Sequence, residues 1–305
     1  MKKIKAFIKR FLERLSPEPE VAGCSLGFSD IRYVAGSGKG AEKYSAQIPE
    51  GVFREGVVQN EELLQKALET LHDTLLPKKK NEVIKAVISL PPGVVYTQSV
   101  KTPYVGEKDV EESVGLNLQI VTPIRAEDAY MDWQKIKEFD NEVEILGVFV
   151  EKARIDKIRG PLERAKFSPV AFEFPALSLT RVIKQKEGDE GVMKMYVYVG
   201  NDGIDFFMTK EGALSFDYFI SWKEIQGDAG EVSGELFDET LMREARKVMN
   251  FAVSKEGKSV ERAAYVAEGL EKRVEDVLRE RLGLKTEAVE IEGETRGPLW
   301  YVAEG

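Results

Sequence analysis

The stretch "VAGCSLGFSDIRYVAGSGKG", residues 21–40, has the layout of a phosphate-binding segment. It reads as an apolar strand, a tight turn at Gly27, Phe28 and Ser29, a second strand and a glycine-rich turn. Backbone N–H groups of such a turn can hold phosphate oxygens, and carboxylates nearby can position Mg²⁺, which prefers oxygen ligands. Asp30 follows the turn, but nothing in the sequence requires its side chain to point into a cleft.

Other residues of chemical interest have simpler explanations. The segment "AGSGKG", residues 35–40, lacks the leading glycine and the final Ser or Thr of a P-loop, so we interpret it as a hairpin turn. His72 follows Leu71 on a helical stretch, and we expect a partly exposed surface residue without hydrolase partners. Asp202 and Asp205 could hold a metal, but an Asp beside Gly in "NDG" is also what a tight turn requires.

Composition narrows the class of protein. The chain has 305 residues, 43% of them hydrophobic, which is enough for two domains with real cores. One cysteine and one histidine exclude an internal disulfide framework and the usual zinc clusters. No apolar run approaches the roughly 20 residues of a membrane span. With a net charge of -9 as well, we expect a cytoplasmic protein that does not bind nucleic acid.

The first fifteen residues, "MKKIKAFIKRFLERL", differ from the rest. They carry a net charge of +5, from six cations and one anion, and their apolar residues recur at steps of three and four. This pattern predicts an amphipathic helix over residues 1–16, which "SPEPE" ends. Such a helix can lie on an anionic membrane, bind a partner or dock on its own protein, and the strong basic bias favours the first two. The membrane or partner positions are Lys2, Lys3, Ile4, Lys5, Phe7, Ile8, Lys9, Arg10, Phe11 and Leu12.

The body of the chain repeats one order of elements. A strand, a hairpin, a helix, a strand, a helix and a strand are predicted before residue 188 and again after it. The charged, glycine-bearing "KEGDEG", residues 186–191, looks like the linker between the two units. The layout predicts two related α/β halves that face each other.

Specific stretches carry a family resemblance over residues 21–290. They are the hairpin of residues 21–34, "IPEGVFREGVVQNEELLQKALETL" (48–71), and the long middle block from "AVISLPPGVVYTQSVKTP" (86–103) to residue 183. Their order resembles the PilM and FtsA group of the actin-like ATPase superfamily, named for the type IV pilus assembly protein PilM. The resemblance implies an α/β actin-like (ribonuclease-H-like) fold of two domains, residues 21–187 and 190–305, with an inserted subdomain at about 89–160.

The same resemblance defines a nucleotide site, which this chain matches poorly. Ser25 and Tyr198 stand where the two phosphate hairpins of the family carry metal-positioning aspartates, and Phe28 replaces a small hydroxyl residue. Glu268 intrudes where the family has a Gly-Gly turn at the adenosine. The lid subdomain, 2B, is reduced to "QGDAGEVSGELFD" or missing. The remnant cofactor-binding positions are Ser25, Gly27, Ser29, Gly200, Asp202, Gly203 and Gly269. We therefore expect no catalytic residue, no resident metal and no bound ATP or Mg²⁺.

The resemblance also implies partners. We expect a non-catalytic scaffold at the inner face of the cytoplasmic membrane, in a pilus or secretion machine. It would hold the cytoplasmic tail of a PilN-like membrane protein in a groove near residues 94–103 and 114–120. The alternatives are an ATP-binding assembly ATPase, with Asp30 and Asp205 as rewired carboxylates, and an FtsA-like membrane-attached polymer. A homo-oligomer is compatible with each.

Overall fold

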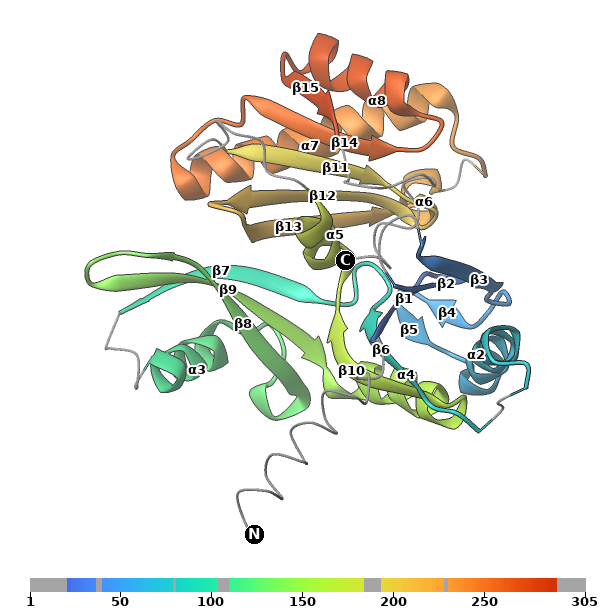
Figure 1. Cartoon of the computed structure of the whole chain (residues 1–305). Coiled ribbons are helices and arrows are strands. Elements are labelled where there is room, and N and C mark those ends of the chain that lie inside the picture. The colour runs from blue at the N-terminus through green and yellow to red at the C-terminus, as the bar shows by residue number, and fades with distance from the viewer. Residues whose placement is uncertain are drawn as a thin grey trace.

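The computed structural model describes residues 21–36, 40–78, 81–103, 110–183, 193–227 and 230–289 (Figure 1). The basic segment 1–15 and the linker at 186–191 lie outside these ranges. No helix in the described part of the chain combines the length and the apolar character needed to cross a membrane.

The first half is built on a five-stranded sheet with the order β10-β6-β1-β2-β3. Strand β1 (Ala22–Leu26) pairs with β2 (Asp30–Ala35) in an antiparallel hairpin, and β2 pairs in the same way with β3 (Glu42–Gln47). On the other side, β1 runs parallel to β6 (Ile84–Ser89), which runs parallel to β10 (Phe167–Glu173). A small hairpin, β4 (Phe53–Arg54) and β5 (Val57–Val58), follows β3.

The helices of the first half show the end cap and the buried apolar face that their sequences predict. In α2 (Glu61–Leu75), the side chain of Asn60 accepts the N–H of Leu63 at 3.0 Å and so caps the helix. The apolar face of α2 is buried, together with that of α4 (Lys152–Arg164), in the core of the first sheet. His72 is also on this face. It is 3% exposed and its Nε2 lies 2.8 Å from the carbonyl of Glu82, so the expected surface position is wrong.

The second half repeats this plan with the strand order β13-β12-β11-β14-β15. The antiparallel strands are β11 (Lys194–Val199), β12 (Gly203–Lys210) and β13 (Ala213–Ser221). The parallel strands are β14 (Arg262–Ala267) and β15 (Lys285–Ala288). Its helices are α7 (Gly234–Glu256) and α8 (Glu271–Asp276), the latter continued by a π-helical turn, η3 (Val277–Arg281). The expected pair of related halves is present.

A third sheet is inserted between β6 and α4. Its order is β7-β9-β8, with β7 (Tyr96–Pro103), β8 (Ala129–Glu138) and β9 (Glu142–Glu151) all antiparallel. The chain between β7 and β8 contains α3 (Val110–Val121) and a 3₁₀ turn, η2 (Ala126–Asp128). Helix α3 buries Val114 and Leu118 against this sheet. Gly147 on β9 permits the close approach, since a Cβ there would lie 2.5 Å from Leu118.

The inserted sheet also packs on the second half, below β12 and β13 in Figure 1. One apolar cluster joins Leu146 of β9, Leu179 of α5 (Pro175–Val182) and Phe207 of β12. Polar contacts reinforce it: Lys210 Nζ lies 2.7 Å from Glu144 Oε2, and the Thr97 hydroxyl donates to Asp217. Glu144 is 1% exposed, so this ion pair is shielded from water. The two halves are therefore bridged by a third body.

The connection after β13 is short. A five-residue helix, α6 (Trp222–Gln226), ends at Gly227, and α7 begins at Gly234. A helical lid subdomain of a few dozen residues does not fit in this interval, which agrees with the expected loss of the lid.

Candidate functional site

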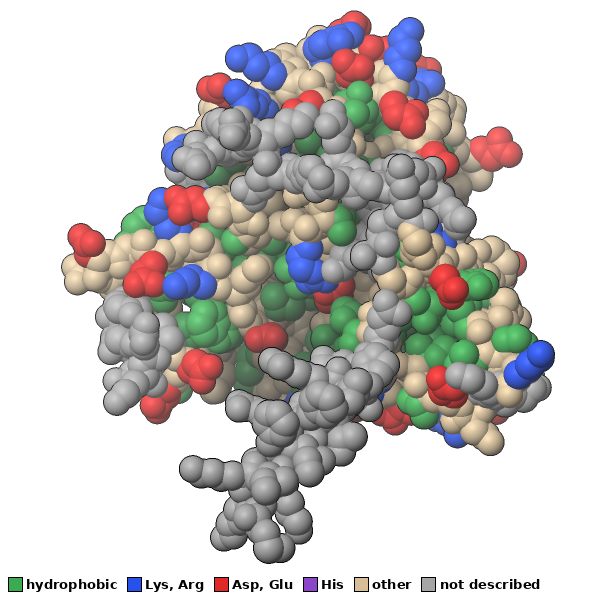
Figure 2. All heavy atoms as spheres, viewed as in Figure 1, with side chains coloured by type: hydrophobic (Ala, Val, Ile, Leu, Met, Phe, Trp, Pro, Cys, Tyr) green, Lys and Arg blue, Asp and Glu red, His purple; other side chains and the backbone are tan. Residues whose placement is uncertain are grey.

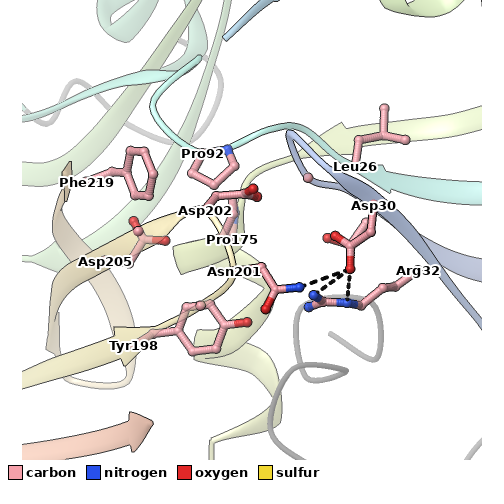
Figure 3. Close-up of a pocket in the computed structure, with 14 residues that line it drawn as sticks. Leu26, Asp30, Arg32, Pro92, Pro175, Tyr198, Asn201, Asp202, Asp205 and Phe219 are labelled. Carbon is pink, nitrogen blue, oxygen red and sulfur yellow. Dashed lines mark hydrogen bonds and ion pairs between the residues drawn. The ribbon is translucent and has the colours of Figure 1, made fainter. Parts of the chain in front are cut away.

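The two glycine-bearing turns meet between the halves of the molecule. Figure 3 shows Leu26, Asp30 and Arg32 from the first half facing Tyr198, Asn201, Asp202 and Asp205 from the second. The small hollow between them, which we call the hinge cavity, has a volume of about 30 Å³. Its lining includes the expected positions Ser25, Gly27, Gly200, Asp202 and Gly203. A space of this size holds about one or two water molecules and no nucleotide.

The first turn is already occupied by a carboxylate of this chain. The N–H of Phe28 donates to Asp202 Oδ1 at 3.0 Å, across the space between the halves. A Cβ at Gly27 would lie 2.8 Å from the other oxygen, Asp202 Oδ2, so only glycine allows this approach. Asp202 thus takes a hydrogen bond that a phosphate would need in a site of this design.

Asp30 points into the cavity, a direction that the sequence left open. Its Oδ2 accepts hydrogen bonds from Arg32 Nε at 3.0 Å and Nη2 at 2.7 Å, and from Asn201 Nδ2 at 3.2 Å. Asp30 and Arg32 are both buried, 9% and 8% exposed. The carboxylate is therefore held by a guanidinium group and joined to the second half, and is not a free metal ligand.

Three carboxyl groups near the two turns and the inserted sheet have raised pKa values. Burial raises the pKa of Asp202 to about 6, aided by the Asp30 charge and opposed by the Phe28 N–H and Arg32. Burial also raises the pKa of Asp217 to about 6, against the Thr97 hydrogen bond. The pKa of Asp205 is raised well above its usual range by burial and then by the Asp217 and Asp202 charges. Asp205 lies inside β12, so a turn role is wrong for it. Across the described residues, no group of three or more His, Cys, Asp or Glu could hold a metal ion.

Tyr198 fills the position of the second expected aspartate. Its ring is 7% exposed, and burial raises the pKa of its phenol far above the usual value. Figure 3 shows the phenol oxygen directed toward Arg32. The replacement therefore puts an uncharged aromatic group where the family places a metal-positioning carboxylate.

A larger hollow lies beside the hinge cavity, and we call it the front cavity. It has a volume of about 820 Å³ and lies between the β4–β5 hairpin, the two turns, the end of β13 and α6. Ser29 lines it, together with Phe28, Phe53, Phe219 and Trp222. The indole N–H of Trp222 donates to the carbonyl of Gly200 at 3.0 Å and so covers the second turn.

Gly269 lies elsewhere. It lines a third cavity of about 600 Å³ that shares no lining residue with the other two. In that cavity Asp238 accepts Arg273 Nε at 2.6 Å and Arg281 Nη2 at 3.3 Å. A Cβ on Gly234 would be 2.4 Å from Arg273, so this guanidinium packs directly on the start of α7. The remnant positions therefore do not form one continuous nucleotide site.

The expected tail groove is mixed in character. Val94 and Val114 are fully buried core residues, whereas Tyr96, Leu116 and Ile120 are 42%, 57% and 81% exposed. Leu116 and Ile120 are four residues apart on α3 and so share one face. Figure 2 shows charged side chains crowded over the helices of the second half and hydrophobic side chains at the surface lower down.

Sequence reasoning missed several residues of this region, notably Arg32, Asn201, Asp217 and Trp222. A signal existed for one of them: Arg32 follows Asp30 by two positions, and residues so spaced on a strand share a face. Asp217 and Asn201 contact residues about 120 and 170 positions away in the chain, which no local pattern reveals. Trp222 directly follows the end of β13, and its contact with Gly200 depends on the fold.

Comparisons with known proteins agree on the fold. No protein-family model and no curated protein matches the sequence. Among solved structures, a chain of the PilM-PilN type IV pilus biogenesis complex superposes with a TM-score of 0.73 at 17% identity, covering 94% of this chain and 97% of that one. The ethanolamine utilization protein EutJ of Carboxydothermus hydrogenoformans gives a TM-score of 0.55 at 10% identity, covering 94% and 89%.

A third structure is the cytoplasmic domain of EpsL, an inner membrane component of the type II secretion system of Vibrio cholerae. It gives a TM-score of 0.50 at 13% identity, covering 93% of this chain and 92% of that one. These identities establish shape and not activity. The resemblance found in the sequence is confirmed at the level of the fold: the chain has the actin-like fold, in a form similar to that of the PilM-PilN complex over nearly its whole length.

Proposed function

We propose that this chain is a non-catalytic, PilM-like scaffold of a type IV pilus or type II secretion-like machine. One observation carries the proposal: the carboxylate of Asp202 occupies the N–H of Phe28 in the first phosphate hairpin. A nucleotide phosphate would have to displace this carboxylate while another anion, Asp30, lies beside it. Binding of Mg-ATP is therefore the direct test of the non-catalytic role.

The slow-ATPase alternative has less support. It requires Asp30 and Asp205 to position Mg²⁺ and water. Asp30 is held by Arg32, and burial disfavours the charged form of Asp205. Each carboxylate would have to leave its present state before it could serve a metal.

The structural neighbours support the proposed place of this chain in a pilus or secretion machine. The PilM-PilN complex and EpsL belong, by their names, to a type IV pilus and a type II secretion system. This chain would work on the cytoplasmic side of the inner membrane, as a fixed platform whose halves and insert are tied by Lys210–Glu144 and Asp202–Phe28 contacts.

The proposed partner is the cytoplasmic tail of a PilN-like protein. Exposed apolar side chains at Leu116 and Ile120 offer the contacts such a tail would cover. The probe is a labelled peptide with the cytoplasmic-tail sequence of a PilN-like protein, and its binding is followed by fluorescence anisotropy. Leu116→Ser with Ile120→Ser should weaken binding at least about ten-fold, which corresponds to about 1.4 kcal/mol. Gln119→Ser, an exposed change on the same helix, is the matched control. Equal binding by the double variant would reject this groove.

Membrane attachment is the second part of the proposal and rests on residues 1–15. Co-sedimentation with anionic phosphatidylglycerol vesicles should be lost when residues 1–16 are deleted, and should weaken with salt because exposed charges are screened. Unchanged sedimentation of the deletion variant would reject this part. Pelleting of filaments by the full chain would instead favour the FtsA-like polymer.

A further inference from the structure

The front cavity has a fixed aromatic wall. The ring of Phe28 lies 6.2 Å from that of Phe53 and 6.3 Å from that of Phe219, measured between centroids. Trp222 is fixed by its hydrogen bond to Gly200 and by packing at 6.2 Å against Phe237. The cavity volume, about 820 Å³, lies within the range of small-molecule sites, about 300 to 1,000 Å³. Contacts within the protein therefore hold the aromatic wall in place.

The floor of this cavity presents acceptors. Asp202 and Asn201 line both the front cavity and the hinge cavity. Asp202 Oδ1 accepts the Phe28 N–H, and within the described ranges no donor bonds its Oδ2. The side-chain amide N–H of Asn201 is committed to Asp30, so its amide oxygen remains as an acceptor. Aromatic faces around a carboxylate are the surroundings that an organic cation prefers.

Charge at the cavity is negative overall. Its lining carries two cations, Arg54 and Lys223, and three anions, Glu55, Asp202 and Glu224. Asp202 is partly buried, whereas the other four groups are exposed, and Glu224 already accepts hydrogen bonds from the N–H and the hydroxyl of Ser221. Water screens the exposed charges, so the field at the floor is set by Asp202. From the elements behind it, Asp30 and Arg32 of β2, Tyr198 of β11 and Asp205 of β12 also face Asp202.

We propose that the front cavity binds an organic cation, an ammonium or guanidinium group on an apolar stem. The cation pairs with the Asp202 carboxylate, and the stem packs against the rings of Phe28, Phe53 and Phe219, which line the same cavity. The same chemistry is available from a free alkylamine or from a Lys or Arg side chain of a partner polypeptide. A phosphate ester is disfavoured, because Asp202 would repel it.

The proposed site gives the poorly solvated charge of Asp202 a role. Burial raises its pKa to about 6, so at neutral pH the protein holds a charged group without a full partner. A bound cation would supply that partner and lower the pKa. Binding should therefore release a fraction of a proton near pH 6.

The test titrates the full chain with agmatine and with hexylamine, and binding is followed by calorimetry and by the tryptophan fluorescence, to which Trp222 at the cavity contributes. Saturable binding is expected for both cations. None is expected for hexanol, which has the hexyl chain of hexylamine without the charge. Asp202→Asn should weaken binding at least about ten-fold, whereas Glu55→Gln, a change at the exposed rim, should alter it less than about two-fold. Absence of saturable binding by the unaltered chain, or equal binding by Asp202→Asn, would overturn the proposal.

Two further measurements, a pH series and a titration with a tripeptide, complete the test. In the unaltered chain, affinity should fall as the pH drops through about 6, because protonated Asp202 no longer attracts a cation. Affinity that stays constant from about pH 5 to about pH 8 would contradict the proposal even if Asp202→Asn failed to fold. The capped tripeptide Ala-Arg-Ala separates the sources: tighter binding than agmatine assigns the site to a partner polypeptide, and weaker binding assigns it to a free amine.

Discussion

Asp202 accepts the backbone N–H of Phe28 at 3.0 Å, although 174 positions separate the two residues in the chain. The contact joins the turn of the first hairpin to the turn of the second. The resemblance found in the sequence implies that these turns would face each other across a nucleotide, whereas here a side chain of the protein lies between them.

The first prediction concerns the stability cost of Asp202. Its pKa rises from 3.8 to about 6 on folding, so the folded chain holds the proton more tightly than the unfolded chain does. The contribution of this group to the free energy of unfolding is therefore fully present below pH 3.8 and is lost as the pH rises through about 6. Asp202→Asn keeps an acceptor for Phe28 without the charge. At pH 7.5 we expect it to raise the free energy of unfolding by on the order of 1 to 2 kcal/mol, a value reduced for partial solvation. Urea denaturation at about pH 4 and about pH 7.5 checks this, since the gain should vanish at the lower pH. A variant less stable than the parent at pH 7.5 would show that the charge is stabilising.

The second prediction concerns the ion pair between the insert and the second half. Lys210→Met leaves the buried Glu144 with Ser99 at 3.1 Å and without its 2.7 Å cation. We expect a loss of about 2 to 4 kcal/mol, because one partner of a buried pair is removed. The double variant with Glu144→Gln should recover most of it in a thermal melt. Strictly additive losses would mean that the two residues do not interact.

The third prediction concerns the packing of α3 on the inserted sheet. Gly147→Ala would place a methyl group 2.5 Å from the Leu118 side chain, so that side chain or the helix must shift, at a cost of about 1 to 3 kcal/mol. Gly115→Ala on the same helix meets nothing within 4 Å and should stabilise by about 0.5 to 1 kcal/mol. The two melting temperatures should therefore shift in opposite directions. A shift in the same direction would place α3 differently from the structure.

The fourth prediction concerns the carboxyl group tied to the insert. Burial raises the pKa of Asp217 to about 6, so its charged form is disfavoured in the folded chain, while Thr97 donates a hydrogen bond to it. Thr97→Val removes the group that lowers this pKa. The pKa of Asp217, followed by carboxyl ¹³C chemical shifts, should rise further in this variant. An unchanged titration would mean that Thr97 does not donate to Asp217 in solution.

Much of the fold was predictable because local patterns and global packing agree. The alternation in β1 and the Asn60 cap of α2 are local signals, and the repeat of hairpin, helix and strand follows from them. His72 was misplaced because its burial depends on Glu82 and Phe167, which come from segments that no local pattern joins to α2.

The site was predictable in part. The turns at Gly27 and Gly200 and the missing carboxylates at Ser25 and Tyr198 are visible in the sequence. The place of the Asp202 carboxylate was not, since it depends on how closely two separately folded halves approach. The surroundings of Asp217 were hidden for a similar reason, because they come from the third sheet packing on β13.

The most direct measurement is a thermal melt of the full chain with and without millimolar Mg-ATP, compared with calorimetric titration of the same nucleotide. The account predicts an unchanged melting temperature and no heat of binding, because Asp202 holds the first turn. A site filled a hundred-fold above its dissociation constant would add about 2.7 kcal/mol to the free energy of unfolding. An upward shift of that size would contradict the account and restore the ATPase alternative.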